Sequence, residues 1–210
     1  MHSGQPLMRI LLAIALAAAA LEAGAQDRLP PLATDQLTEP QAQALADFVT
    51  ARGTPTGPWI ALLRSPELMK RTRGVSDYLR FESVVPGWLR EFVILMTARQ
   101  WAQNYEWNAH YAIAIDEGLS PDIARAIAEG RRPDGMVREE EILYEFCLEL
   151  QRNHSVSDAT YERALERFGE QGVVEVVSLM GYYTMISMIL NTSRAPLPDG
   201  AVPALAPFPY

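Results

Sequence analysis

Three titratable residues in one short segment, Glu91, Glu106 and His110, could carry out acid–base chemistry. Glu106 and His110 are four positions apart, so on a helix their side chains lie on one face, a turn apart. An imidazole beside a carboxylate is suited to moving a proton or binding a metal ion. The surrounding segment, EFVILMTARQWAQNYEWNAH, is largely apolar, and burying unpaired titratable groups is costly. The pattern therefore predicts that the three side chains form one partly buried cluster.

Two helices have to position this cluster. Apolar residues recur at helical spacing over 86–102, and a second helix over 105–117 ends at Gly118, a residue that favours helix C-termini. About two residues join these helices, so we expect a helical hairpin that brings Glu91 towards His110. In a straight antiparallel pair, Glu91 would lie roughly 16 Å from the turn and His110 roughly 8 Å. Contact between them therefore requires inclined helices and an extended glutamate side chain.

Each of these residues also has a structural interpretation. His110 could be a core histidine that is satisfied by a carboxylate, and Glu91 could form a buried ion pair with Arg90 or Arg99. Glu91, Glu106 and His110 could instead hold a divalent cation, because three nitrogen or oxygen ligands with an open position suit zinc or iron. A Glu–His pair at this spacing is a weak metal signal, and no second histidine is nearby. We therefore expect neither a metal nor a cofactor.

The same segment resembles the carboxymuconolactone decarboxylase family, which includes the AhpD-like alkylhydroperoxidases. The resemblance rests on Glu91, on the run YEWNAH at 105–110 and on the run EGLS at 117–120. It spans roughly residues 55–195 and implies an all-α, AhpD-like helical domain, built around the helical hairpin and a buried C-terminal helix.

AhpD-like members carry a glutamate, a CxxC pair and a histidine four residues after the second cysteine. In this sequence the glutamate is Glu91, the cysteine positions are Gln103 and Glu106, and the histidine is His110. Peroxide reduction needs a thiolate and a resolving thiol. Cys147 is the only cysteine, and it lies on an apolar helical stripe that predicts a buried structural thiol. The chain thus resembles a subgroup without the CxxC pair, and thiol peroxidase activity is disfavoured.

The resemblance implies a small-molecule lyase, decarboxylase or isomerase. His110 would move a proton, while Glu91 and Glu106 would set its tautomer and pKa or act as a second acid–base group. A non-catalytic or metal-binding oligomeric module on the same fold is the alternative.

The resemblance also implies an anionic substrate. Its carboxylate would be bound by an arginine such as Arg99 or Arg80. Trp107, Tyr105 and Gln103 lie in the same segment and are further candidates for substrate contact.

The composition indicates one soluble globular domain. The chain has 210 residues, of which 49% are hydrophobic and 21% charged, and its formal net charge is −8. That charge argues against nucleic acids and anionic membranes as partners. Caps and helical periodicity predict helices over 38–52, 66–73, 76–83, 86–102, 105–117, 121–130, 137–153, 158–168 and 171–191.

The last of these helices is apolar nearly all round, which predicts burial in the core or at a subunit contact. Glu175 and Ser178 argue against a membrane span. The family resemblance implies helical oligomers, so we expect a homo-oligomer, a trimer or a hexamer.

The N-terminus resembles a secretory signal peptide. Arg9 precedes an apolar run over 10–21, and the small residues 23–25 suit signal peptidase, with cleavage expected before Gln26. The apolar run is shorter than the ~20 residues that a membrane-spanning helix needs. We expect a periplasmic or secreted protein. The predicted divisions are a signal peptide (1–25), an extension with one helix (26–54), the decarboxylase-like domain (55–195) and a proline-rich tail (196–210).

Overall fold

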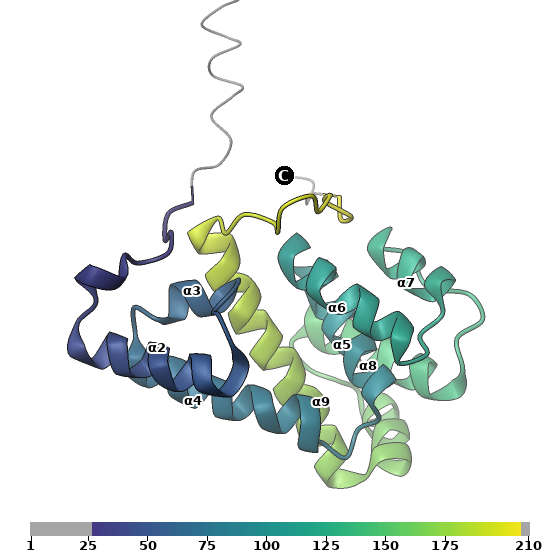
Figure 1. Ribbon diagram of the computed structural model, residues 1–210. Helices are drawn as coiled ribbons and strands as arrows, with labels where there is room; N and C mark the ends of the chain where they lie inside the picture. Colours follow the sequence, from purple (N-terminus) through teal and green to yellow (C-terminus); the bar gives the residue numbers. More distant parts are fainter. Residues whose placement is uncertain (1–26, 207–210) are drawn as a thin grey trace, which may run out of the picture.

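The computed structural model describes residues 27–206, so the predicted signal peptide at 1–25 lies outside the described part. Within residues 27–206 the secondary structure is helical throughout, which confirms the all-α prediction (Figure 1).

The N-terminal elements begin and end where local signals indicate. Their bounds are η1 Thr34–Gln36, α2 Glu39–Arg52, α3 Pro58–Leu62, α4 Pro66–Asp77 and η2 Tyr78–Glu82. The backbone N–H of Thr38 donates to Gln41 Oε1 at 3.0 Å at the start of α2, and Gly53, with φ 79°, ends it. The helices predicted over 66–73 and 76–83 are continuous, because α4 passes directly into the π-helical turn η2.

The C-terminal elements form the larger part of the core. Their bounds are α5 Gly87–Gln100, α6 Asn104–Asp116, α7 Pro121–Ala128, α8 Arg138–Asn153 and α9 Asp158–Ser193. The two helices predicted over 158–168 and 171–191 belong to one element, α9, which is kinked at Gly169 (φ 69°). Glycine tolerates this left-handed backbone conformation, so the helix changes direction there without a loop.

The α5–α6 pair forms the predicted hairpin. Ala102 has φ 45° in the tight connection, and the Gln103 side chain accepts a hydrogen bond from the Tyr105 backbone N–H at 2.6 Å at the start of α6. Helix α5 packs against α6, α7, α8 and α9, and its Leu89 and Phe92 are fully buried. Glu91 therefore lies on a helix that is covered by neighbours on most of its surface.

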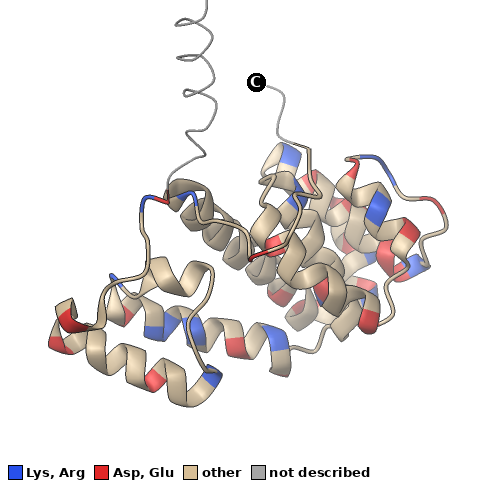
Figure 2. Ribbon diagram, turned by 45° about the horizontal axis from the view of Figure 1, so that its top comes forward, with Lys and Arg blue, Asp and Glu red and all other residues tan. Residues whose placement is uncertain are grey.

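Helix α9 runs through the middle of the fold, between α3 and η2 on one side and α5 and α8 on the other (Figure 1). Its C-terminal half shows no charge in Figure 2, whereas charged residues mark the peripheral helices. It is long and apolar enough to cross a membrane, yet much of it is buried within the described fold. One face stays exposed, where Val174, Val177 and Met188 are 63%, 42% and 49% accessible.

Candidate active site

Glu91 and His110 form a buried hydrogen-bonded pair between α5 and α6. His110 Nδ1 lies 2.7 Å from Glu91 Oε2, and the two side chains are only 6% and 8% exposed. The tautomer with its proton on Nδ1 donates to the Glu91 carboxylate oxygen in this contact, and Nε2 is then the ring nitrogen that is not engaged by Glu91. The structure thus makes the contact that a straight hairpin would not allow.

Glu106 faces the other nitrogen of the same ring. Its Oε2 lies 3.6 Å from His110 Nε2, and its side chain is 5% exposed. Burial raises the pKa of the Glu106 carboxyl above its ordinary 4.5, and the nearby His110 and Arg80 charges oppose that rise. The separation exceeds a direct hydrogen bond, so an atom of a bound molecule could bridge the two groups.

Two tyrosines of α9 complete the surroundings of the histidine. The Tyr183 ring meets the His110 ring edge-on, with 5.0 Å between centroids, and Tyr182 packs against Tyr183 at 5.1 Å. Burial raises the pKa of Tyr182 to about 12 and that of Tyr183 well above 10. Both hydroxyls therefore stay protonated near neutral pH and can donate hydrogen bonds.

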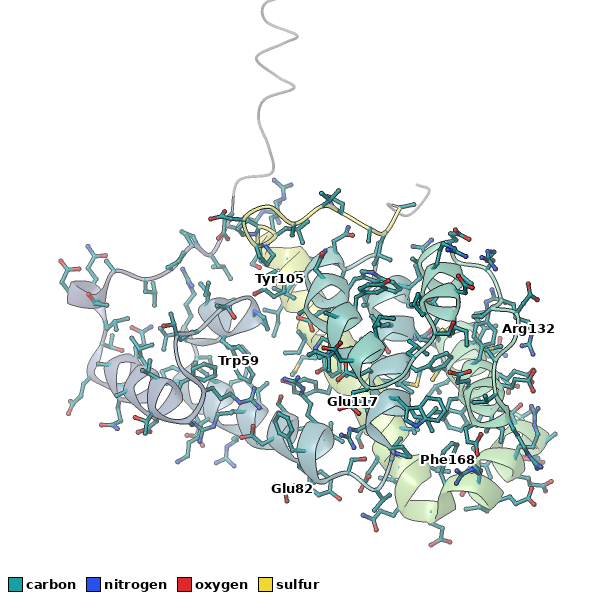
Figure 3. All side chains as sticks on the ribbon, turned by 45° about the vertical axis from the view of Figure 1, so that its right-hand side comes forward. Trp59, Glu82, Tyr105, Glu117, Arg132 and Phe168 are labelled. Carbon is teal, nitrogen blue, oxygen red and sulfur yellow. The ribbon has the colours of Figure 1, made fainter. Side chains whose placement is uncertain are left out.

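A cavity of about 160 Å³, here called the inner chamber, opens beside His110 and Glu106. It lies where α2, α3, α4, η2, α6 and α9 meet, and Trp59 of α3 and Tyr105 of α6 are labelled in Figure 3. Besides His110 and Glu106, its polar and aromatic lining includes Arg52, Trp59, Ser76, Arg80, Tyr105, Tyr182 and Tyr183. The chamber thus combines residues from six elements of the fold.

Arg80 reaches the inner chamber from η2. This turn is anchored to α9 through Glu175, which accepts hydrogen bonds from the Tyr78 hydroxyl at 2.5 Å and from the Ser83 hydroxyl at 2.6 Å. The Val84 backbone N–H also donates to Glu175 at 2.8 Å. Burial alone would raise the pKa of Glu175, but these hydrogen bonds lower it below its ordinary value, so it remains a strong acceptor.

The other residues that we expected to contact substrate are distributed differently. Tyr105 lines the chamber, whereas Gln103 caps α6 and donates to Asn191 Oδ1 at 2.7 Å. Trp107 is buried and stacks on Tyr111, with 6.3 Å between ring centroids. The structure does not bring Gln103 or Trp107 to the chamber lining.

Arg99 also lies away from the chamber. Its Nη1 donates to the Ala206 carbonyl at 3.3 Å, and its guanidinium lies beside Gly130. Eight residues, or about 12 Å of helix, separate it from Glu91 on α5. Of the two arginines considered from sequence, only Arg80 lines the chamber.

The described residues offer neither a reactive thiol nor a cluster of metal-binding side chains. Cys147 is fully buried, and burial raises the pKa of its thiol to about 12, so it is no source of thiolate. Across residues 27–206, no group of three or more His, Cys, Asp and Glu side chains is arranged to hold a metal ion.

The structure resembles several solved structures, three of which are described below. No protein-family model and no curated protein matches the sequence. An uncharacterized peroxidase-related protein from Ralstonia eutropha, described as an alkylhydroperoxidase AhpD core, matches with TM-score 0.67 and 19% identity, over 82% of this chain and 92% of that one. A peroxidase-related protein from a Silicibacter species matches with TM-score 0.66 and 14% identity, over 85% and 93%.

A third structure is a protein of unknown function from Agrobacterium tumefaciens, described as a candidate antioxidant defence protein AhpD. It matches with TM-score 0.54 and 17% identity, over 65% of this chain and 94% of that one. Likeness at these identities concerns the arrangement of helices and leaves the chemistry open. This chain has the AhpD-like fold, with a single cysteine and no CxxC pair.

Proposed function

We propose that this protein is an exported small-molecule enzyme that uses His110 and Glu106 for acid–base chemistry, in the manner of a lyase, isomerase or decarboxylase. One observation carries the proposal. His110 has its Nδ1 engaged by Glu91 at 2.7 Å and its Nε2 directed towards Glu106 at the wall of the inner chamber.

Glu91, His110 and Glu106 have different proposed roles because they lie at different positions relative to the chamber. Glu91 does not line the chamber, so it orients the imidazole and stabilises the imidazolium that forms when Nε2 takes a proton. Nε2 acts as the base that removes a proton from a carbon next to a carbonyl group. Glu106 is buried, and its raised pKa makes its protonated form a proton donor to the adjacent atom of the intermediate.

The same residues argue against a thiol peroxidase. The cysteine positions of the AhpD-like pattern hold Gln103 and Glu106, neither of which forms a thiolate. Cys147 is buried, with a pKa near 12, and has no second cysteine as partner. The peroxidase-related descriptions of the structural neighbours therefore do not extend to this site.

Hydrogen exchange into candidate substrates tests the proposal without knowledge of the product. Small carbonyl acids are incubated with the enzyme in D₂O, and deuterium incorporation at carbon is followed by NMR and mass spectrometry. We expect His110→Gln to slow the exchange by about 10²–10⁴-fold while leaving the thermal transition largely intact.

His154→Gln is the matched control, because His154 is an exposed histidine at the end of α8. Exchange that survives in His110→Gln would contradict the role of the imidazole. Unfolding of that variant, with no exchange by wild type, would favour a structural role for His110.

A further inference from the structure

Arg80 is a cation in the inner chamber that lacks an acceptor. Across the described residues no hydrogen bond or ion pair involves its guanidinium, and its Nε is buried without a partner. The other arginine of the chamber, Arg52, is engaged by Asp77 and by Ser76. A buried N–H without a partner is costly, so the Arg80 environment favours a bound acceptor.

The fold holds Arg80 in place. It lies in the π-helical turn η2, between Tyr78 and Ser83, and both of these donate to the buried Glu175 of α9. Such turns are common at functional sites. Because both ends of the turn are tied to α9, the backbone that carries Arg80 keeps its position, which lowers the ordering cost of binding.

Arg80 also lines a second cavity that shares residues with the chamber. It lines both the inner chamber and an adjoining cavity of about 420 Å³, here called the outer cavity, together with Arg52 and Trp59. A molecule that occupies both cavities therefore contacts Arg80, whereas only its part in the inner chamber lies beside His110 and Glu106.

Size and charge narrow the class of molecule. The inner chamber of about 160 Å³ corresponds to roughly five water molecules, each taking about 30 Å³ of the liquid. Glu106 lines the chamber and Glu91 lies behind His110, so a dianion would meet two carboxyl groups. The Arg80 guanidinium has no hydrogen-bond or ion-pair partner among the described residues, so it matches one negative charge, and its planar donors match a carboxylate.

We propose that Arg80 is the anion-binding residue of this site and that the substrate is a short-chain monocarboxylate. The carboxylate lies on the Arg80 guanidinium, and the chain extends into the inner chamber towards His110 and Glu106. Only the reaction at the far end of the chain rests on the proposed function; the binding site stands on Arg80, Glu175 and the chamber.

Saturation-transfer difference NMR tests the binding site directly. The mature protein, from Gln26 onward, is titrated with butyrate and with acetate at constant ionic strength, and inorganic phosphate is added as a competitor. We expect saturable butyrate binding that Arg80→Gln weakens roughly tenfold to a hundredfold, since a charge-assisted hydrogen bond is lost. Arg125→Gln is the matched control, because Arg125 is an exposed arginine, paired with Asp122 on α7, and should bind like wild type.

Two further variants separate the possible failures. Arg80→Lys keeps the positive charge but lacks the planar donors, so we expect its butyrate affinity to lie between those of wild type and Arg80→Gln. Such an intermediate affinity would show that the weaker binding of Arg80→Gln does not come from a folding defect. His110→Gln should retain butyrate affinity even where proton exchange is lost. The proposed binding site and the proposed chemistry can therefore be refuted separately. Any of three results would overturn the proposal. Arg80→Gln could bind butyrate as tightly as wild type, wild type could bind butyrate without saturation, or phosphate could displace butyrate at a lower concentration than acetate does.

Discussion

The buried Glu91–His110 pair should be a strongly coupled energetic unit. Its atoms are 2.7 Å apart and its side chains are 6% and 8% exposed, so Glu91→Ala leaves His110 Nδ1 buried without an acceptor. Breaking a buried pair in this way costs about 3–5 kcal/mol. For a chain of this size that corresponds to a fall of roughly 6–20 °C in Tm. Glu91→Gln keeps an acceptor oxygen and should cost less than about 1.5 kcal/mol.

A double-mutant cycle measures the coupling. Urea unfolding is followed for Glu91→Ala, for His110→Ala and for the variant with both changes. Because each single change already breaks the pair, we expect the double variant to be less destabilised than the sum by about 1.5–3 kcal/mol. The exposed Asp122–Arg125 pair has the same 2.7 Å distance, but its side chains are 76% and 62% exposed, so a parallel cycle should give at most about 1 kcal/mol.

Additivity would refute this reasoning. If the two single changes sum to the effect of the double change within about 0.5 kcal/mol, Glu91 and His110 do not interact in solution. The orientation of the imidazole by Glu91 would then lose its basis, whatever the activity of the single variants.

Three further predictions concern Glu106, Cys147 and the N-terminus. Burial raises the pKa of Glu106 in the folded state, so the stability that Glu106 contributes is lost as pH rises from 4.5 through that pKa. Glu106→Gln should remove this loss. Urea midpoints that change with pH in the same way for both proteins would contradict this prediction. Cys147 should resist iodoacetamide in the native protein and react in urea, and Cys147→Ser should leave hydroperoxide consumption at background. Mass spectrometry of exported protein should find Gln26 as the first residue, and a full-length soluble form would exclude cleavage.

Local signals were sufficient for most helix ends. Thr38 and Gly53 bound α2, and Ser120 precedes α7, as capping preferences predict. These signals involve hydrogen bonds within a few residues of each helix end, so they can be recognised without knowledge of the fold. The kink at Gly169 is a partial exception, because the glycine that would end a helix instead bends α9 between its two packed halves.

The sequence could also place Glu106 beside His110, since spacing along one helix determines which side chains share a face. The contact between Glu91 and His110 does not follow from helical spacing. It depends on how α5 and α6 are inclined, and straight helices would have separated the two residues. The hairpin was predictable from its short connection, whereas its packing angle was not.

Only the tertiary structure selected Arg80 as the arginine of the chamber. From sequence, Arg99 was an equal candidate and lies on the same helix as Glu91, yet its guanidinium lies near Gly130 and Ala206. Arg80 reaches the chamber because Glu175 ties its turn to α9, through contacts that span more than 90 positions. No local pattern encodes such a contact. Helical spacing placed Glu106 beside His110, and long-range packing of several elements decided what surrounds the two residues.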